Sequence, residues 1–515
     1  MGRGIRFVLD GAVVDLGQVD PTLTALEVLR GTLRRTGTKE GCAEGDCGAC
    51  TIVIGELADL PIPSPNGQDF TSERCPQHTN ARSAHSSATV AVQWRAVNAC
   101  ILLAPMLDGK AVLTVESLSR HGALHPLQQA LVDGHGSQCG FCTPGFVMSL
   151  YARSIGALGT EATDVADVIA GNLCRCTGYG PILAAGRAIV PDPARAENVT
   201  TALLELARED ALGYVWHDPY SGMARHCFAP RSVEALAARL LEYPDAHLVA
   251  GATDVGLWVT KQLRTLATII LIGGIAELRQ LEEDVSGLRI GAAVRYTEAH
   301  AALARLHPDL GELVRRIGAL QVRNAGTLGG NIANGSPIGD TPPALIALGA
   351  QLVLRRGDAR RTLALEDFFI DYGKQDRQPG EFVEQLVVPR PSAAARIHVR
   401  KLSKRFDSDI SAVCGAAYVE LEHGRVRTAR IAFGGMAATP RRAHHAEAAL
   451  RGALWGEAAL DAAARALAED YAPLDDVRGS ARYRLQVAGN FLRGMWLREL
   501  SQQPLSVLEL ERTDG

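Results

Sequence analysis

Apolar positions in the first 37 residues predict two short strands followed by a helix. The stretch IRFVLDGAVVDL places alternating strand-like runs on either side of Asp10 and Gly11, a pair that favours a tight hairpin turn. In the next stretch, DPTLTALEVLRGTLRRTG, leucines recur with the spacing of one helix face. We expect Asp20 to cap this helix, Pro21 to open it and Gly37 to end it.

Further along, the pattern changes several times, which predicts a multidomain α+β protein. Residues 58–90 are rich in Pro, Ser, Asn and His without apolar periodicity and are expected to form a loop-like insertion. Helical spacing dominates residues 115–190, strands and helices alternate after Arg225, and strands followed by helices return after Pro389. The predicted domains are 1–112, 113–190, 223–390 and 391–515, with a linker at 191–222 that includes one possible helix.

Composition narrows the possible functions. The chain has 515 residues, 47% of them hydrophobic, and a formal net charge of −4, which favours neither nucleic acid nor an anionic membrane as a partner. No apolar run approaches the roughly 18 residues of a membrane span, and no signal peptide is evident, so we expect a cytoplasmic protein. In a reducing compartment, the 11 cysteines indicate metal or redox chemistry rather than disulfides.

Three cysteines in KEGCAEGDCGAC have the spacing of metal ligands. The pattern Cys42-x4-Cys47-x2-Cys50 matches three ligands of a plant-type [2Fe–2S] cluster, and the interleaved glycines allow the backbone to approach the sulfurs. Zinc is the main alternative metal, although paired CxxC spacings are more usual for it. Spacing alone leaves the fourth ligand open between Cys75 and Cys100.

A second group of cysteines lies in GSQCGFCTPGF and GNLCRCTGYGP. It combines Cys139 and Cys142 with Cys174 and Cys176, again enough for one four-thiolate site. The short Cys-x-Cys bite suits bridged iron better than a tetrahedral zinc ion, which remains the alternative. We expect a helix after the first pair, with Thr143 as its N-cap, whose positive end would face an anionic cluster.

Two glycine-rich segments in the middle of the chain are candidates for nucleotide binding. These are LVAGATDVGLW, from Leu248, and RNAGTLGGNIANGSPIGD, from Arg323. Turns of this composition expose backbone N–H groups that can hold a diphosphate. Neither segment has the GxGxxG or Walker A pattern, so neither a Rossmann nor a P-loop site is indicated, and ordinary turns are the alternative.

Together these motifs resemble xanthine dehydrogenases and related molybdenum hydroxylases. The resemblance rests on KEGCAEGDCGAC, RAVNAC, GSQCGFCTPGF, GNLCRCTGYGPI and the two glycine-rich loops, and it covers residues 3–190 and 222–500. It implies a β-grasp ferredoxin-like domain, a helical [2Fe–2S] domain, an FAD-binding domain of the vanillyl-alcohol-oxidase type and a C-terminal α+β flavoprotein domain. It also implies that Cys100 is the fourth ligand of the first cluster and that Cys75 belongs to an insertion.

The resemblance further implies a set of cofactor contacts. Gln138 would contact a pterin across a subunit interface, and FAD would be held by Leu248, Val249, Ala250, Gly251, Ala252, Thr253, Asp254, Val255, Thr327, Leu328, Gly329, Gly330, Asn331, Asp340, Val383 and Lys401. Ile317 replaces an aromatic residue that is frequent in the family. Tyr372 and Asp409 are weaker candidates for the NAD side, with a structural role as the alternative.

The function implied is that of the small subunit of a split bacterial xanthine dehydrogenase. Electrons from hypoxanthine or xanthine, hydroxylated at a molybdenum cofactor on a separate large subunit, would pass through two [2Fe–2S] clusters to FAD and then to NAD. No residue of this chain is expected to catalyse purine hydroxylation, and an α2β2 heterotetramer is expected. The alternatives are a relay subunit of another molybdenum hydroxylase, with a different substrate or acceptor, and a zinc-stabilised scaffold protein.

Overall fold

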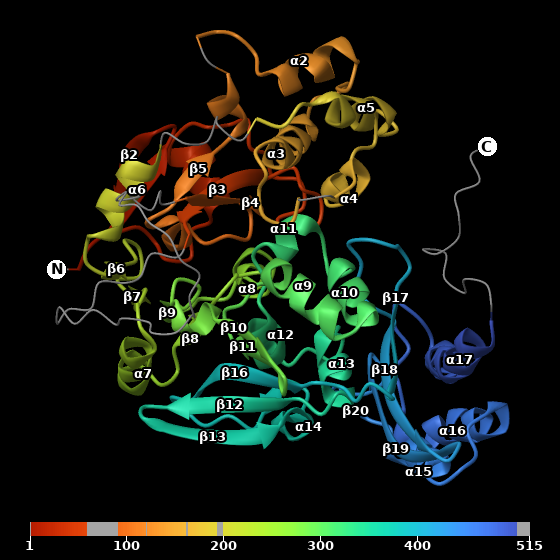
Figure 1. Ribbon diagram of the computed structural model, residues 1–515. Helices are drawn as coiled ribbons and strands as arrows, with labels where there is room; N and C mark the ends of the chain where they lie inside the picture. Colours follow the sequence, from red (N-terminus) through yellow and green to blue (C-terminus); the bar gives the residue numbers. More distant parts are fainter. Residues whose placement is uncertain (1, 59–90, 120, 161–162, 193–198, 502–515) are drawn as a thin grey trace, which may run out of the picture.

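The computed structural model describes residues 2–58, 91–119, 121–160, 163–192 and 199–501 and confirms a multidomain α+β architecture (Figure 1). The chain runs from a small sheet through a group of helices into two further sheets and ends in a sheet covered by helices. The expected insertion at 58–90, with Cys75, lies outside the described residues except for residue 58.

The N-terminal sheet has five strands in the order β2-β1-β5-β3-β4. Their bounds are β1 Ile5–Leu9, β2 Ala12–Gly17, β3 Thr51–Leu57, β4 Val92–Asn98 and β5 Ala111–Leu113. Asp10 and Gly11 form the predicted hairpin turn, both with positive φ, 53° and 82°. The loop of Cys42–Cys50 leads into β3, and Cys100 follows β4. Because Thr51 pairs with Asn98, the loop and Cys100 lie at the same end of this strand pair.

The helix predicted to start at Asp20 starts later, so that expectation is wrong in its bounds. Helix α1 spans Ala25–Glu27 and continues as a π-helical turn, Val28–Thr32. Thr24 is the N-cap and forms a capping box with Glu27, whereas the Asp20 carboxylate instead accepts from Thr22 N–H at 2.9 Å. A complete capping box satisfies two helix-end donors at once, which explains why Thr24 is preferred.

Within the described residues, five α-helices follow the first sheet. They are α2 Pro126–Asp133, α3 Thr143–Ser154, α4 Val165–Ile169, α5 Gly180–Ala188 and α6 Thr200–Ala207. The N-cap of α3 is Cys142 rather than the predicted Thr143, because the Thr143 hydroxyl pairs with that of Ser137 at 2.8 Å. Helix α6 falls within the range expected to be a linker.

The middle of the chain contains two sheets. The first, in the order β6-β7-β9-β8, comprises β6 Gly213–His217, β7 Ala224–Phe228, β8 His247–Val249 and β9 Thr268–Leu271. The second, in the order β10-β11-β16-β12-β13, comprises β10 Leu281–Asp284, β11 Gly287–Gly291, β12 Gln351–Arg356, β13 Ala359–Ala364 and β16 Phe382–Pro389. Strand β6 also lies in the expected linker range and pairs with β7.

The helices of this middle part are mostly short. Their bounds are α7 Val233–Glu242, α8 Val255–Thr260, α9 Tyr296–Leu306, α10 Pro308–Arg315, α11 Leu320–Arg323, α12 Leu328–Asn334, α13 Thr341–Ala347 and α14 Leu365–Phe368. A two-stranded ribbon, β14 Phe369–Asp371 with β15 Lys374–Gln375, adjoins them. Helix α12 packs against β16 and α13, so it stands between the second sheet and the C-terminal part.

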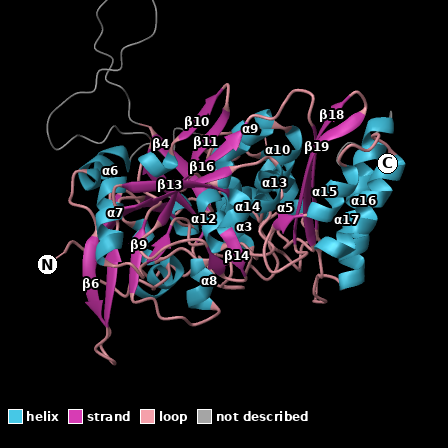
Figure 2. Cartoon of the chain, turned by 90° about the horizontal axis from the view of Figure 1, so that it is seen from below, coloured by secondary structure: helices cyan, strands magenta, loops and turns pink. Residues whose placement is uncertain are grey.

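The C-terminal part is a four-stranded sheet with three helices packed on it (Figure 2). It comprises β17 Arg396–Leu402, β18 Val413–Glu422, β19 Arg425–Gly434 and β20 Arg441–Arg442, with α15 His444–Leu450, α16 Glu457–Asp470 and α17 Ala481–Leu500. The predicted hairpin at His423 and Gly424 is present, again with two positive φ values, 50° and 74°. None of the described helices has the length and apolarity needed to cross a membrane.

The first sheet and the β6–β9 sheet share one hydrophobic core. Buried Ile52 and Cys100 from the first pack in the same cluster as Val249, Ala252 and Ile269 from the second. A continuous core fixes the relative position of the two sheets, because separating them would expose buried apolar surface. The cysteine loop is therefore held next to the first glycine-rich segment.

Candidate redox and dinucleotide site

Four cysteines of the N-terminal part converge, and we call them the inner cysteine set: Cys42, Cys47, Cys50 and Cys100. The Sγ atoms of Cys50 and Cys100 are 3.2 Å apart, and Cys42 makes side-chain contacts with both Cys47 and Cys100. Cys50 and Cys100 are only 1% and 2% exposed. Hydrogen bonds from the Cys100 and Cys47 thiols lower the pKa of Cys42, and the same contacts raise the pKa of Cys47 and of Cys100, so the negative charge of a thiolate is stabilised at Cys42.

The backbone around the inner cysteine set turns where the sequence has glycine. Gly45 and Gly48 have positive φ, 80° and 68°, a conformation that costs glycine little. A Cβ at Gly48 would also lie 2.2 Å from the Gly171 carbonyl oxygen, so this position admits no side chain. The four thiols and the compact loop fit a cluster with four thiolate ligands.

The second group of cysteines converges at the surface, and we call it the outer cysteine set: Cys139, Cys142, Cys174 and Cys176. Cys142 contacts Cys174, and Cys139 contacts Cys176. Cys139 and Cys176 are exposed. Burial raises the pKa of Cys142 to about 12, whereas at Cys174 the hydrogen bonds from Thr177 outweigh burial and lower the pKa. These four thiols also fit a four-thiolate cluster, whose binding would require all of them to be deprotonated.

Direct hydrogen bonds join the loops of the two cysteine sets. Leu173 N–H donates to the Cys47 carbonyl at 3.0 Å, one residue before Cys174. The Asn172 amide donates to the Gly48 carbonyl at 3.1 Å, and Gly145 of α3 packs so closely that an added Cβ would lie 2.2 Å from the same carbonyl oxygen. The two loops are thus adjacent through backbone contacts rather than through intervening side chains.

A buried amide network stabilises this junction. Gln321 of α11 donates to Asn172 Oδ1 at 3.1 Å and to the Ser149 hydroxyl at 3.0 Å, and Ser149 also donates to Asn172 at 2.7 Å. All three side chains are buried. Buried polar groups are costly unless they are hydrogen-bonded, so the bonds made by the Gln321 amide N–H groups specify how α3, α11 and the outer loop fit together, although Gln321 Oε1 has no partner within the described residues.

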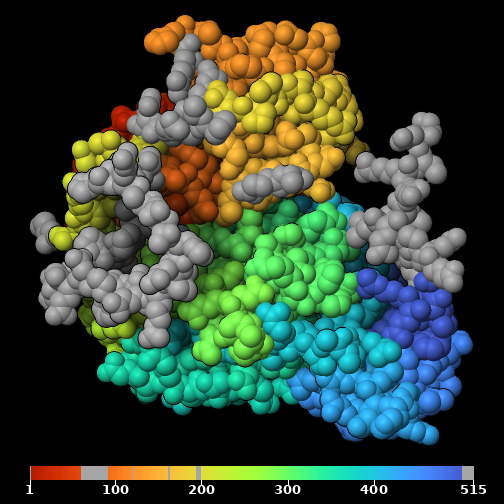
Figure 3. Space-filling view, in the orientation of Figure 1, coloured from red at the N-terminus to blue at the C-terminus, as the bar shows by residue number. Residues whose placement is uncertain are grey.

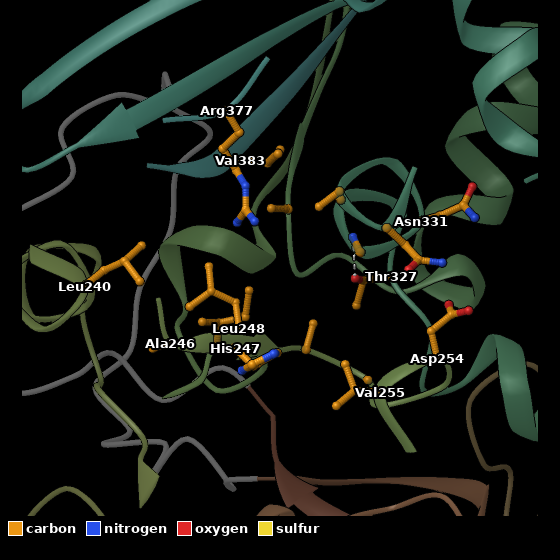
Figure 4. A pocket seen from close by; sticks show the side chains of 18 of the residues that line it. Leu240, Ala246, His247, Leu248, Asp254, Val255, Thr327, Asn331, Arg377 and Val383 are labelled. Carbon is orange, nitrogen blue, oxygen red and sulfur yellow. Dashed lines mark hydrogen bonds between the residues drawn. The ribbon is translucent and has the colours of Figure 1, made fainter. Parts of the chain in front are cut away.

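A cavity of about 450 Å³ lies between the loop after β8 and helix α12 (Figure 4). Most of the residues expected to hold FAD line it, namely Leu248, Ala250, Gly251, Ala252, Thr253, Asp254, Val255, Thr327, Gly329, Gly330, Asn331 and Val383. Val249 and Leu328 do not line it, because their side chains point into the cores and are 1% and 0% exposed. The volume is in the range of cofactor sites.

Asp340 and Lys401 lie apart from the residues that line this cavity and bind each other instead. The Lys401 ammonium donates to Asp340 Oδ2 at 2.6 Å, and the Ser411 hydroxyl donates to Oδ1 at 2.5 Å. Both charged side chains are buried. Their expected contact with FAD therefore stays a prediction, and in this structure the pair joins the start of α13 to strand β17.

The cavity wall has the features that a diphosphate needs. Ala252 has a positive φ of 58°, and an added Cβ at Gly251 would lie 1.8 Å from the Ala325 carbonyl oxygen, so the two glycine-rich segments touch. Within the described part of the chain, the backbone N–H groups of Ala252, Thr253 and Asp254 have no acceptor. Three such donors beside the start of a helix fit an anionic group such as a diphosphate.

Several cavity residues escaped the sequence reasoning. Arg377 enters from the segment before β16 and faces the cavity, with His247 and Leu248 on the opposite side (Figure 4). Burial lowers the pKa of Arg377, and no carboxylate within the described residues forms an ion pair with it. Trp258 and Tyr296 complete the wall. The sequence feature that could have pointed to Arg377 is its place in the Pro- and Gly-containing stretch KQDRQPGEF.

Helix α8 connects the cavity to the inner cysteine set. The helix begins at Val255 on the cavity wall, and at its other end the Thr260 hydroxyl donates to the Ala43 carbonyl at 2.7 Å. Gly256 packs against the Ile101 backbone, where an added Cβ would lie 2.5 Å from the carbonyl oxygen. The cavity, the inner set and the outer set therefore follow one another in space.

The remaining candidates lie at the surface or take structural roles. Gln138 is exposed beside the outer cysteine set, and Tyr372 is exposed on the β14–β15 ribbon. Asp409 accepts from Arg405 N–H at 2.8 Å and so orders its own loop. Ile317 packs at the edge of a core. Within the described residues, no group of three or more His, Cys, Asp or Glu side chains is placed to hold a single metal ion, whereas the four thiolates of a [2Fe–2S] cluster are divided between two irons.

Comparison with known families and proteins gives three matching family models. They are described as a [2Fe-2S] binding domain over residues 114–187, an FAD binding domain in molybdopterin dehydrogenase over 222–391 and a CO dehydrogenase flavoprotein C-terminal domain over 398–498. The last two meet near the start of β17, close to the boundary expected at residue 391.

Individual relatives agree with these matches. The chain is 32% identical over 557 residues to xanthine dehydrogenase of Emericella nidulans, covering 97% of this chain and 39% of the relative. It is 29% identical over 539 residues to xanthine dehydrogenase/oxidase of Gallus gallus, covering 91% and 38%. A carbon monoxide dehydrogenase chain from Hydrogenophaga pseudoflava matches with a TM-score of 0.50 and 32% identity, covering 52% of this chain and 94% of that one. The chain thus spans about two fifths of the length of these curated relatives.

Proposed function

Because the chain belongs to the molybdenum hydroxylase family and carries its iron–sulfur and FAD parts, we propose that it is the electron-relay subunit of a xanthine dehydrogenase. In this proposal, a separate molybdenum-binding subunit hydroxylates hypoxanthine or xanthine, and NAD is the final acceptor. The two clusters would supply one-electron steps, and FAD would supply the conversion to a hydride equivalent.

The observation that carries the proposal is the position of the inner cysteine set. Its loop contacts the outer set through the Leu173–Cys47 hydrogen bond and contacts the cavity helix through Thr260 and the Ala43 carbonyl. A relay needs its carriers in sequence, with the middle one shielded from water. The inner set has the buried middle position, which supports a relay better than two independent structural metal sites.

Each cofactor is assigned to residues of this chain. Cys42, Cys47, Cys50 and Cys100 would ligate one [2Fe–2S] cluster, and Cys139, Cys142, Cys174 and Cys176 the other. The loop of residues 251–254, helix α12 and Arg377 would hold FAD, with the backbone N–H groups of the loop directed to its diphosphate. The outer set, with exposed Cys139 and Cys176 and with Gln138 beside it, would face the molybdenum subunit.

The end of the molecule that carries the outer set suits such an interface. Helices α2–α5 form one end of the molecule, away from the C-terminal part (Figure 3). Phe141 and Leu173, which adjoin the cysteines in sequence, expose 45% and 40% of their surface there, and Leu124, just before α2, exposes 47%. Large exposed apolar side chains around a redox site are typical of a docking surface for a partner protein.

The deciding experiment is co-expression of this chain with a candidate molybdenum subunit. We expect a complex with four irons per copy of this chain, a flavin spectrum, and NADH formation on addition of hypoxanthine or xanthine. Dye reduction without NADH formation would overturn the NAD assignment alone. Activity with carbon monoxide but not with purines would overturn the substrate assignment, and a colourless zinc protein would overturn the relay itself.

A further inference from the structure

A second cavity lies behind the dinucleotide loop. It encloses about 180 Å³ between the N-terminal sheet, the chain after helix α6 and the far side of the loop formed by Ala250 and Gly251. Thr327, the N-cap of α12, lies on its wall as well as on that of the larger cavity. The small cavity is therefore separated from the proposed FAD site by one layer of backbone.

Among the charged side chains on the wall of this small cavity, the positive ones are in the majority. Arg95, Lys110, Arg231 and Arg295 line it, and the acidic residue on the wall is Asp108. Asp108 is already bound to Arg3 through an ion pair of 2.6 Å. Asp108 is therefore shared between Arg3 and the cationic wall groups.

One buried carboxylate outside the wall serves several of these cations. Glu56 lies 2.6 Å from Arg95 and 2.7 Å from Arg295, and Arg279 approaches it at 3.5 Å. These guanidinium groups hold the pKa of Glu56 well below its usual range although burial opposes ionisation. Even with Glu298 bound to Arg295 at 3.0 Å, positive groups outnumber carboxylates at this place.

Lys110 has no carboxylate partner within the described residues. Its ammonium donates to the Met106 carbonyl at 2.7 Å, which uses one of three N–H groups. Burial, together with the neighbouring Arg95 and Arg295, outweighs the opposing effect of the Glu56 and Asp108 carboxylates and lowers the pKa of Lys110 to about 8. Arg95, 7% exposed at its side chain, also has a buried Nε–H without an acceptor in the described part of the chain.

Size restricts what could neutralise this charge. Sites for nucleotides and drug-sized ligands occupy about 300–1,000 Å³, whereas a water molecule takes about 30 Å³ in the liquid. A cavity of about 180 Å³ accommodates a small oxyanion with a few waters but excludes a nucleotide. Water alone would leave the excess positive charge in a medium of low polarity, which is costly.

We propose that this cavity is a binding site for a tetrahedral oxyanion of the inorganic phosphate class, held by Lys110, Arg95 and Arg231. Such an anion would supply acceptors for the free N–H groups and offset the excess charge. It would also bridge the N-terminal sheet, through Lys110, to the segment at Arg231 that leads into helix α7. The site is separate from the proposed redox cofactors and does not depend on the identity of the substrate.

The test uses the full chain with its cofactors bound and inorganic phosphate as the probe. Calorimetric titration and thermal unfolding are measured against phosphate, with sodium chloride adjusted to keep the ionic strength constant. We expect saturable binding of one phosphate per chain and a midpoint of unfolding that rises with occupancy. Sulfate should compete with phosphate, and adenosine monophosphate at the same concentration should not bind at the small cavity.

Matched variants locate the site. Lys110→Met should weaken phosphate binding at least tenfold while leaving the flavin absorbance unchanged, and Arg231→Gln should weaken it to a smaller extent. Without phosphate, Lys110→Met should be at least as stable as the wild type, because an uncompensated buried cation is removed. Lys374→Met, at an exposed lysine of β15, should bind phosphate like the wild type.

Three outcomes would overturn the proposal. These are the absence of saturable binding at millimolar phosphate, an equal stabilisation by sodium chloride at the same ionic strength, and unchanged binding in Lys110→Met. Tighter binding of adenosine monophosphate that is lost in Lys110→Met would overturn the assignment to a free oxyanion. None of these results depends on purine turnover, so the proposed relay function can fail independently.

Discussion

The two cysteine sets present the same ligand chemistry in opposite surroundings. In the inner set, Cys50 and Cys100 are almost fully buried in the core that joins the first two sheets. In the outer set, Cys139 and Cys176 are exposed, beside exposed Phe141 and Leu173. The inner set is therefore enclosed by the fold of this chain, whereas part of the outer set remains open at the surface, as the proposed contact with a partner subunit requires.

This contrast also explains how the two sets can work together. The inner loop is fixed by the core beneath it, by α8 on one side and by the outer loop on the other. A buried group with fixed neighbours keeps a constant environment when a partner binds or leaves. Cys139 and Cys176 of the outer set are exposed, so in the proposed complex the environment of this set should change when the partner subunit binds.

The largest effect is expected from replacing one ligand in each set. Cys100→Ser should remove the spectroscopic signal of one cluster and lower the free energy of unfolding by about 1–3 kcal/mol, because a buried hydroxyl lacks partners in that core. Cys176→Ser should remove the other signal and leave stability almost unchanged. In both variants, the rate of electron transfer to the flavin should fall by more than about 100-fold. This loss exceeds the usual effect of replacing a residue that only hydrogen-bonds to a metal ligand. Electron paramagnetic resonance and thermal unfolding measure these effects.

Cys75→Ser is the control for the choice of the fourth ligand. Cys75 lies outside the described residues, and Cys100 lies 3.2 Å from Cys50. Both cluster signals should therefore persist in Cys75→Ser. Retention of both signals in Cys100→Ser, with loss of one in Cys75→Ser, would reverse the ligand assignment.

The second prediction concerns removal of iron. A chelator added to the isolated chain should extract iron from the outer set about tenfold faster than from the inner set. This ratio corresponds to a difference of about 1.4 kcal/mol between the free energies of the local openings that expose the two sites. Loss of the two cluster signals is followed over time by visible circular dichroism and paramagnetic resonance. Binding of the molybdenum subunit should slow the loss from the outer set alone, and equal rates in the isolated chain would contradict the contrast.

The third prediction concerns the contact between the two sets. Gly145→Ala would place a Cβ 2.2 Å from the Gly48 carbonyl oxygen and should destabilise the protein by about 1–3 kcal/mol, a typical cost of overpacking. Both cluster signals should shift, because α3 and the inner loop must move apart. Gly180→Ala, also on a helix but with no atom within 4 Å of the added Cβ, should change neither stability nor signals appreciably.

Local patterns explain how much of this arrangement was predictable from sequence. Asp10-Gly11 and His423-Gly424 set their hairpins through residues that tolerate positive φ, and both turns are present as expected. The cysteine spacings and glycine-rich loops identified the segments that now meet. The helix predicted from Asp20 began at the wrong residue, because two cap candidates compete locally and only the capping box of Thr24 with Glu27 resolves the choice.

Long-range contacts explain what the sequence could not reveal. Gln321 and Asn172 are separated by 149 positions, and neither stands out in the sequence, yet they share a buried network with Ser149. Arg377 comes from a loop without a recognisable motif and reaches the cavity because β16 carries that loop past the glycine-rich segment. Contacts between residues this far apart in the sequence follow from tertiary packing rather than from local pattern. The same holds for the positive side chains that line the small cavity.

The smallest effect is expected from replacing Arg377. This replacement should affect FAD binding without affecting either cysteine set. Arg377→Ala should weaken FAD binding about tenfold, or about 1.4 kcal/mol, near the lower end for hydrogen bonds to charged groups. Both cluster signals should remain, because Arg377 lies on the cavity wall rather than in either cysteine loop. Titration of flavin-free protein with FAD, followed by fluorescence, measures the affinity.

Arg289→Ala, at an exposed arginine of β11 in the same sheet as β16, is the matched control and should bind FAD normally. Unchanged affinity in Arg377→Ala would remove this arginine from the site, and loss of a cluster signal would show that the cavity and the inner set are coupled more tightly than α8 alone implies.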